Sequence, residues 1–203
     1  LLYARVQACQ KKRNASDKKA TRESANTPYL FQEIRQPSER YLAIPSVVAE
    51  TREFYTVAYL DKKVIAGNKL YTAIDPDGFL FAIISSSMFI TWQRAVGGHM
   101  KSDLNFSNKI VWNTLPLPEV SDKQRTAIIA AGQGVLDARA EQPGVSLADM
   151  YNPLAMAPSL LKAHRILDRA VDRAFGARKA LETNEQRLTL LFKRYQEMTA
   201  TDS

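Results

Sequence analysis

The sequence predicts an α+β fold, in which a mixed α/β part with a small β-sheet and one buried helix precedes an all-α helical bundle or hairpin. Three features of the 203-residue chain predict it. Residues 41–71 have a strand-like texture, with Tyr41, Ala43 and Pro45 alternating with Leu42, Ile44 and Ser46 and with many β-branched and aromatic side chains at 54–60. Residues 78–96 are apolar with helical spacing. Beyond residue 120, apolar side chains recur with the 3.6-residue period of amphipathic helices.

The mixed part is expected to consist of short strands around one helix. Asp75–Gly78 has the composition of a turn, and the helix is predicted from Gly78 to about Val96, where Gly97 ends it. Pro116 and Pro118 close this part. The predicted strands cover residues 41–46, 54–60, 69–74 and 100–115. The predicted division of the chain is 1–40 as a basic linker and lead-in, 41–118 as the mixed domain, and 119–203 as the helical domain.

The helical part begins with a recognisable start signal. Ser121 with Gln124 three residues later forms a capping box, which predicts a helix running to about Ala140. Two further apolar stripes predict helices over residues 159–175 and 183–199, joined near Gly176 as an antiparallel hairpin. His164 is followed by Arg165, so we expect a surface imidazole there.

Positive charge is concentrated at the start of the chain. The sequence has 28 Lys and Arg against 21 Asp and Glu, and nine basic but only four acidic residues lie within residues 1–40. Such a cluster attracts polyanions because binding releases condensed counterions. The alternative is a solvated, partly disordered tail. The candidate phosphate-binding residues are Lys11, Lys12, Arg13, Lys18, Lys19, Arg22, Arg35 and Arg40.

Groups that could support catalysis or bind a metal are sparse. Cys9 is the single cysteine, so it cannot form an internal disulfide, and His99 and His164 lie in separate regions. We find no nucleophile with a base, no phosphate-binding glycine loop and no metal-ligand spacing. The chain is therefore expected to be non-catalytic, with no metal and no cofactor of its own.

No segment predicts membrane insertion or targeting. The longest apolar stretch, residues 78–84, is far shorter than the roughly 20 residues that span a bilayer. The start lacks both an initiating Met and a cleavable apolar segment. We expect a piece of a longer, soluble, cytoplasmic protein.

Several stretches, in one order along the chain, resemble the C-terminal part of MmeI-like (type IIL) restriction–modification enzymes, which join an adenine-N6 DNA methyltransferase to an endonuclease. The resemblance runs from about residue 24 to the C-terminus. It is carried by Asn26-Thr-Pro-Tyr-Leu-Phe, Glu33-Ile-Arg-Gln-Pro, Arg40-Tyr-Leu-Ala-Ile-Pro, Ser86-Ser-Met, Trp92-Gln-Arg-Ala-Val, Val111-Trp-Asn-Thr-Leu-Pro-Leu-Pro and Asp149-Met-Tyr-Asn-Pro-Leu-Ala-Met-Ala-Pro.

The resemblance implies a target-recognition domain followed by a C-terminal helical domain. Methyl transfer and the S-adenosylmethionine site would then lie in an upstream domain of the same polypeptide, and the partner of this chain would be double-stranded DNA. The parent would be a site-specific, adenine-specific DNA methyltransferase. In this setting the basic residues of the lead-in would contact phosphates and set register without reading sequence.

Base reading requires polar side chains on an exposed face that can enter the major groove. Alternation along residues 101–105 places Lys101, Asp103 and Asn105 on one predicted strand face, offering a donor to guanine, an acceptor for cytosine and an amide suited to adenine. The resemblance implies further specificity positions near Asn68-Lys69 and Ser46. We call these six the base-reading set. The alternative for each is an ordinary solvated residue.

A different class of function is also compatible with the sequence. In that alternative the helical hairpin docks a protein partner as an interaction scaffold, and the basic segment is a solvated tail.

Overall fold

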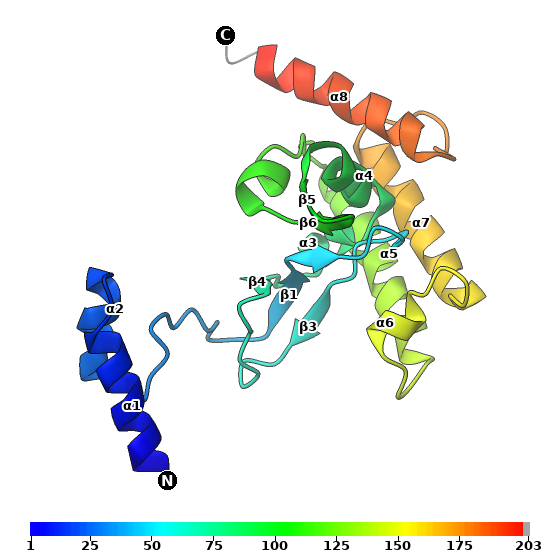
Figure 1. Cartoon of the computed structure of the whole chain (residues 1–203). Coiled ribbons are helices and arrows are strands. Elements are labelled where there is room, and N and C mark those ends of the chain that lie inside the picture. Colours follow the sequence, from blue (N-terminus) through cyan, green and yellow to red (C-terminus); the bar gives the residue numbers. More distant parts are fainter. Residues whose placement is uncertain (201–203) are drawn as a thin grey trace. The chain divides into compact units, whose positions relative to one another are not determined.

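The computed structural model describes residues 1–200, and the chain divides into two compact units, residues 1–36 and residues from Pro37 onward. Figure 1 labels the elements. Among the described residues, no helix is both long and apolar enough to cross a membrane.

The first unit is helical. It contains α1 (Leu2–Asn14), α2 (Lys19–Glu23) and a 3₁₀ turn over Ser24–Asn26. Arg13 holds the unit together, because its guanidinium donates to the carbonyl oxygens of Ser24 at 2.8 Å, Thr27 at 3.0 Å and Leu30 at 2.6 Å. The basic lead-in therefore contains two helices that composition did not predict.

The second unit begins with two small antiparallel sheets. One has the order β3-β1-β4, formed by Ala58–Leu60, Tyr41–Pro45 and Leu70–Ala73. The other has the order β2-β6-β5, formed by Val47–Val48, Asp103–Asn105 and Gly98–Met100. Ser46 separates β1 from β2, so one continuous segment contributes a strand to each sheet.

Two of the predicted strands are corrected. Only residues 58–60 of the predicted strand 54–60 pair, while Phe54 and Tyr55 are buried side chains of an irregular segment. Of the predicted strand 100–115, Met100 ends β5, residues 103–105 form β6, which pairs with β5 as a hairpin, and a π-helical turn, η2 (Asn108–Trp112), follows. Ser107 begins that turn by accepting from the N–H of Ile110 at 3.4 Å, which favours helix over strand pairing.

The predicted helix 78–96 is two helices, α3 (Phe79–Ile84) and α4 (Ser87–Val96). Ser86 causes the break. Its backbone is extended, its hydroxyl donates to the carbonyl of Ile83 at 2.7 Å, and the same oxygen accepts from the N–H of Phe89 at 3.4 Å. A serine in this conformation starts a new helix by satisfying a free amide at its first turn.

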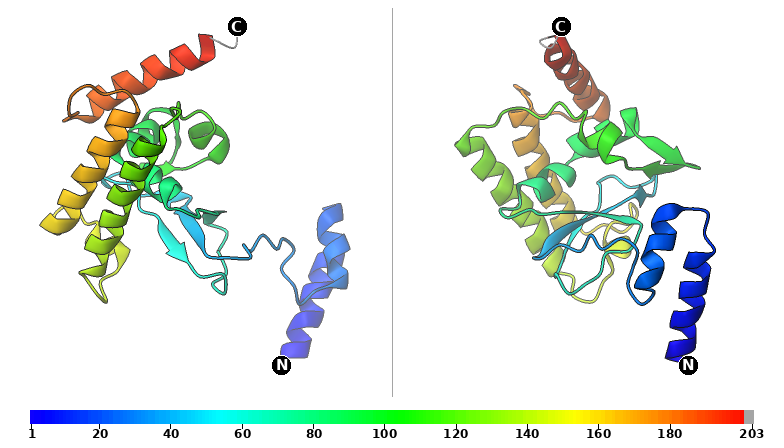
Figure 2. Two further views of the ribbon diagram at one scale, coloured as in Figure 1. Left: turned by 180° about the vertical axis from the view of Figure 1, so that it is seen from behind. Right: turned by 90° about the vertical axis from the view of Figure 1, so that its left-hand side faces the viewer.

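The helical part confirms the predicted elements but not their pairing. The structure has α5 (Asp122–Ala140) with its capping box, the short α6 (Leu147–Met150), α7 (Pro158–Ala174) and α8 (Asn184–Ala200). Helix α7 packs along α5, whereas α8 packs on α4 (Figure 2). The predicted antiparallel hairpin of the last two helices is therefore wrong, because the apolar stripe of each helix matches a different partner.

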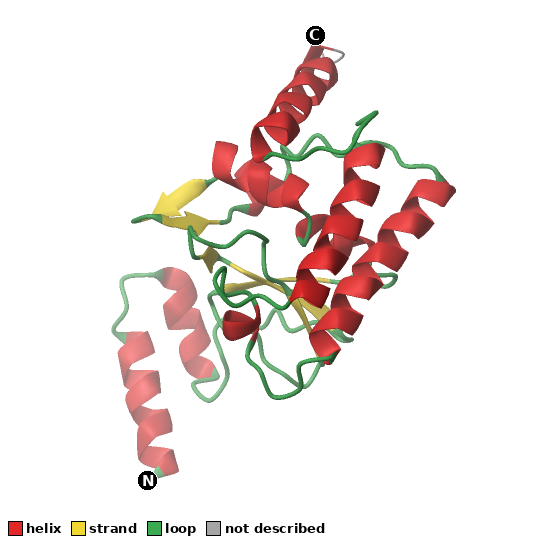
Figure 3. Cartoon of the chain, turned by 90° about the vertical axis from the view of Figure 1, so that its right-hand side faces the viewer, coloured by secondary structure: helices red, strands yellow, loops and turns green. Residues whose placement is uncertain are grey.

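The core of the second unit has three layers (Figure 3). Helices α3 and α4 lie between the α5–α7 layer and the sheets. Residues 81–93, which cover most of both helices, are buried throughout. Aromatic rings connect this middle layer to the segments that flank the strands: the ring centroid of Phe89 lies 5.2 Å from that of Tyr55, before β3, and 6.1 Å from that of Phe106, directly after β6. Gly132 of α5 allows close approach, since a Cβ there would lie 2.7 Å from the Cβ of Ala82.

Candidate nucleic-acid interface

The base-reading set comes from three distant segments that meet at the joint between the two sheets. The backbone N–H of Ser46 donates to the carbonyl of Lys69 at 2.8 Å, and the N–H of Phe106 donates to the carbonyl of Ser46 at 2.8 Å. In the next pair, Val47 lies opposite Asn105. Backbone hydrogen bonds therefore hold Ser46, Lys69 and Asn105 next to one another, although 59 positions separate the first from the last.

The row at residues 101–105 is only partly as predicted. Asp103 and Asn105 are alternate residues of β6, on either side of the buried Leu104, so they share one face and are half-buried. Lys101 lies instead in the two-residue turn between β5 and β6, with a positive φ of 59° and an exposed side chain. Its placement on the strand face was therefore wrong.

The two strand residues are held by different partners. The carboxylate of Asp103 accepts, through Oδ1, from the backbone N–H of Glu50 at 3.3 Å. The carbonyl of Asn105 accepts from Nε2 of the buried Gln93 at 3.2 Å, so the strand rests on α4. Asn68 and Lys69 are exposed, and Ser46 is half-buried.

The candidate phosphate-binding residues divide by whether they already have structural partners. Arg13 binds three carbonyls of its own unit, and Arg22 donates to the carbonyls of Ser16 and Asp17 at 2.8 and 2.9 Å. Lys19 pairs with Glu23 at 3.8 Å, and Arg35 pairs with Glu33 at 2.8 Å. Among the candidate residues within 1–36, those that are exposed and have no such partner are Lys11, Lys12 and Lys18.

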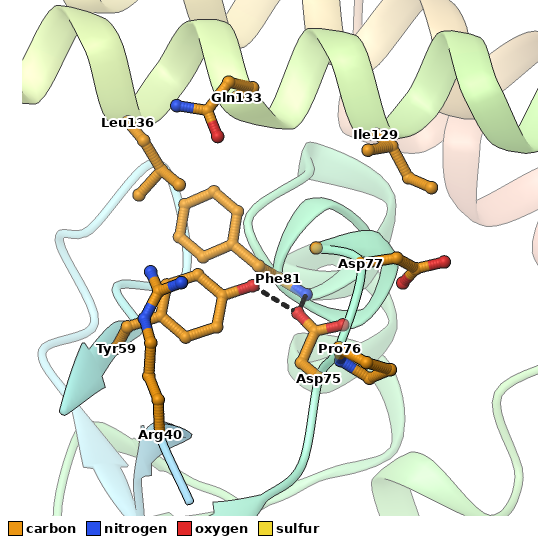
Figure 4. Close-up of a pocket in the computed structure, with 10 residues that line it drawn as sticks. Arg40, Tyr59, Asp75, Pro76, Asp77, Phe81, Ile129, Gln133 and Leu136 are labelled. Atoms are coloured by element: carbon orange, nitrogen blue, oxygen red, sulfur yellow. Dashed lines mark hydrogen bonds between the residues drawn. The ribbon is translucent and has the colours of Figure 1, made fainter. Parts of the chain in front are cut away.

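Arg40 belongs to the second unit, where it lines a pocket of about 220 Å³ (Figure 4). Its guanidinium carbon lies 3.8 Å from the ring centroid of Tyr59, whose hydroxyl donates to Asp75 at 2.5 Å. Burial raises the pKa of Tyr59, and the hydrogen bond to Asp75 adds to the effect. Asp75 also accepts from the N–H groups of Leu80 and Phe81 at 3.2 and 2.8 Å, as a cap of α3. Asp75 and Tyr59 therefore stabilise the predicted turn and the start of α3.

A buried polar network, missed in the sequence, joins the mixed part to the helical part. His164 is fully buried, which corrects the expected surface imidazole. Its ring stacks on Phe54 with centroids 3.9 Å apart, and its Nε2 lies 2.7 Å from the hydroxyl of Tyr151. That hydroxyl accepts from Arg139 at 2.8 Å, and Arg139 also donates to the carbonyl of Val57 at 2.7 Å. Burial, together with the nearby charge of Arg139, lowers the pKa of His164 to about 3.

A second network lies between α4, α7 and α8. Asp168 accepts from both the N–H and the hydroxyl of Ser87 at 2.7 Å. Arg187 binds Asp172 through two hydrogen bonds of 3.0 and 2.9 Å and lies 3.8 Å from Asp168. Burial raises the pKa of Asp172 to about 6, opposed by Arg187. The sequence does show that Asp168 and Asp172 lie on one face of a helix, because they are four residues apart. It does not show their partners, Ser87 and Arg187, which come from other helices.

The geometry defines a class of protein: a β-platform that presents polar side chains from three loops and strands, supported by helices, with a basic unit attached. Among residues 1–200, no group of three His, Cys, Asp or Glu side chains could hold a metal ion.

Comparison with known proteins gives the family. Residues 1–119 match the family model described as MmeI, target recognition domain, and residues 120–202 match MmeI, C-terminal domain. The chain belongs to the MmeI family. Both networks described above cross the junction of these two regions, since Arg139 bonds to Val57 and Asp168 bonds to Ser87.

Two relatives cover nearly the whole chain. DNA methyltransferase A of Bacillus subtilis (strain 168) is 36% identical over 199 residues, which are 98% of this chain and 22% of that protein. A solved structure of the type IIL restriction-modification enzyme MmeI in complex with DNA matches with a TM-score of 0.91 and 39% identity, covering 98% of this chain and 26% of that one. The chain therefore spans about a quarter of the length of these relatives.

Proposed function

We propose that this chain recognises a specific sequence of double-stranded DNA and is the specificity portion of a site-specific, adenine-N6 DNA methyltransferase. The observation that carries the proposal is the meeting of Ser46, Lys69 and the β6 strand at one sheet joint. A groove-reading surface needs several polar side chains of fixed geometry within a few base pairs, and convergence supplies them. The MmeI structure with DNA, 39% identical to this chain, supports it.

In this proposal the chain supplies recognition and the upstream part of the parent supplies methyl transfer. S-adenosylmethionine would bind in that upstream domain, attached in cis, and the enzyme would act in the cytoplasm. The boundaries at 41–118 and 119–203 divide the recognition domain from its helical support. The base-reading set contacts base edges, and the candidate phosphate-binding residues contact the backbone. The alternative scaffold function called for a hairpin of α7 and α8, whereas these two helices pack mainly on α5 and α4.

Phosphate contact is tested by a salt titration of duplex binding. Six or more contacts predict a loss of affinity of about 10³-fold between 50 and 200 mM salt. Replacing Lys11, Lys12 and Lys18 together by Gln should lower the slope of log affinity against log salt by about 3. A chain that binds no duplex even at low salt contradicts the proposal.

Base reading is tested by selecting bound duplexes from a randomised DNA library. The wild-type chain should yield a consensus sequence, and Asp103→Ala should relax one position of it by about 1–3 kcal/mol. The matched control is Asp137→Ala, which removes the same charge from an exposed position of α5. It should leave the consensus unchanged. If Asp103→Ala weakens binding equally to all sequences, the residue does not read a base.

A further inference from the structure

Arg94, in the last turn of α4, binds a loop of the recognition platform and not a carboxylate. Its Nη2 donates to the carbonyl of Arg52 at 2.5 Å and to that of Glu50 at 3.2 Å. Burial lowers the pKa of this guanidinium, opposed by the charges of Glu50 and Glu53. Because the guanidinium is partly removed from water, solvent competes less for its donors, and its hydrogen bonds to the loop are strengthened.

The loop that Arg94 binds also donates a hydrogen bond to a residue of the base-reading set. Residues 49–53 follow β2 directly, and a turn bond from the N–H of Arg52 to the carbonyl of Ala49, at 3.0 Å, closes the loop. Within it, the N–H of Glu50 donates to Oδ1 of Asp103. The same peptide segment therefore accepts from Arg94 and donates to Asp103.

We propose that Arg94 is a positioning residue for base recognition, which acts through the loop 49–53 to orient the carboxylate of Asp103. With Oδ1 fixed by the loop, Oδ2 has no hydrogen-bond partner among residues 1–200 and is available to accept from a base. A preoriented acceptor discriminates better because less side-chain freedom is lost on binding. The inference rests on the proposed function.

The effect of Arg94 should fall on one base pair. A phosphate contact would weaken binding to every sequence alike, whereas a positioning residue changes discrimination only where Asp103 reads. Lysine keeps the charge, but its chain ends one atom short of Nη2, the single nitrogen through which Arg94 donates to both carbonyls. Arg94→Lys is thus the informative substitution.

The experiment uses the full chain and the randomised duplex library, with Arg94→Lys, Asp103→Ala, the double variant and Arg125→Lys. Arg125 is the matched control, because its guanidinium also makes two hydrogen bonds, but to Asp77, outside the β2–β6–β5 sheet. We expect Asp103→Ala to lose roughly 5- to 160-fold of discrimination at one position. Arg94→Lys should lose about tenfold at that same position and nothing elsewhere, and the double variant should match Asp103→Ala alone.

The outcomes separate the two proposals. A wild-type chain that selects no consensus overturns both the proposed function and this inference. A consensus whose Asp103 position is unchanged in Arg94→Lys, or a uniform loss at all positions, overturns the inference alone. Amide hydrogen exchange gives an independent measurement: exchange of the Glu50 N–H should be faster in Arg94→Lys and unchanged in Arg125→Lys, while unchanged exchange in both overturns the inference.

Discussion

Acid should destabilise the chain through His164, a residue at the centre of its buried network. The neutral imidazole stacks on Phe54 and hydrogen-bonds with Tyr151, and burial with the charge of Arg139 lowers its pKa to about 3. In the unfolded chain the pKa of a histidine is near 6.5. Between these values the unfolded chain binds a proton that the folded chain does not, so the stability that His164 contributes is lost as the pH falls.

The magnitude follows from the two pKa values. At pH 5 the unfolded state is favoured by about 2 kcal/mol relative to pH 7.5, since each unit of pKa difference is worth about 1.4 kcal/mol. Asp172 acts in the opposite direction. Its folded pKa of about 6 lies above the unfolded value, so its ionisation opposes folding and acid relieves this. At pH 5 the protonation of Asp172 stabilises the folded chain by about 1 kcal/mol. The pH dependence of the free energy of unfolding of the wild type is therefore smaller than the contribution of His164 alone.

A variant isolates the histidine. Urea unfolding of wild type and His164→Gln at several pH values gives two stability curves whose difference contains the His164 contribution and cancels that of Asp172. We expect the difference to shrink by about 2 kcal/mol from pH 7.5 to pH 5. His99→Gln is the control, because that side chain is exposed and its variant should show a constant difference. A constant difference for His164→Gln would show that the imidazole is not held neutral by burial.

Three further predictions concern stability, each measured by urea unfolding at pH 7.5. Gly132→Ala should cost about 1–3 kcal/mol, because its Cβ would lie 2.7 Å from that of a facing alanine, whereas Gly134→Ala, with nothing within 4 Å, should gain about 0.5–1 kcal/mol; equal effects would refute the close packing of α5 on α3. Lys101→Gly should gain about 0.5 kcal/mol, since the positive φ of 59° is unfavourable for a residue with a Cβ; a loss would mean that the lysine side chain stabilises the turn. Arg187→Leu should cost about 3–5 kcal/mol by leaving two buried carboxylates without their cation, and a loss below 1 kcal/mol would mean that the carboxylates become protonated at little cost.

Local features of the sequence determined most of the secondary structure. The capping box at Ser121 fixed the start of α5, because a side-chain oxygen and a neighbouring glutamine satisfy free amides without help from the rest of the chain. The alternation after Tyr41 predicted β1, and helical periodicity predicted α7 and α8 within one or two residues. The predicted helix 78–96 and the predicted strand 100–115 were both wrong at a serine, Ser86 and Ser107, whose side chain competes for backbone hydrogen bonds.

Tertiary structure decided which elements meet. Periodicity shows that a helix has an apolar face but not what covers it, so it could not tell that α7 packs on α5 and α8 on α4. It could not place His164 in the core, because the partners that make burial tolerable, Phe54 and Tyr151, come from other segments. The joining of Ser46, Lys69 and β6 likewise depends on long-range backbone hydrogen bonds. The sequence by itself therefore determined the elements and the residue types of the recognition surface, while its assembly came from contacts between segments far apart in the chain.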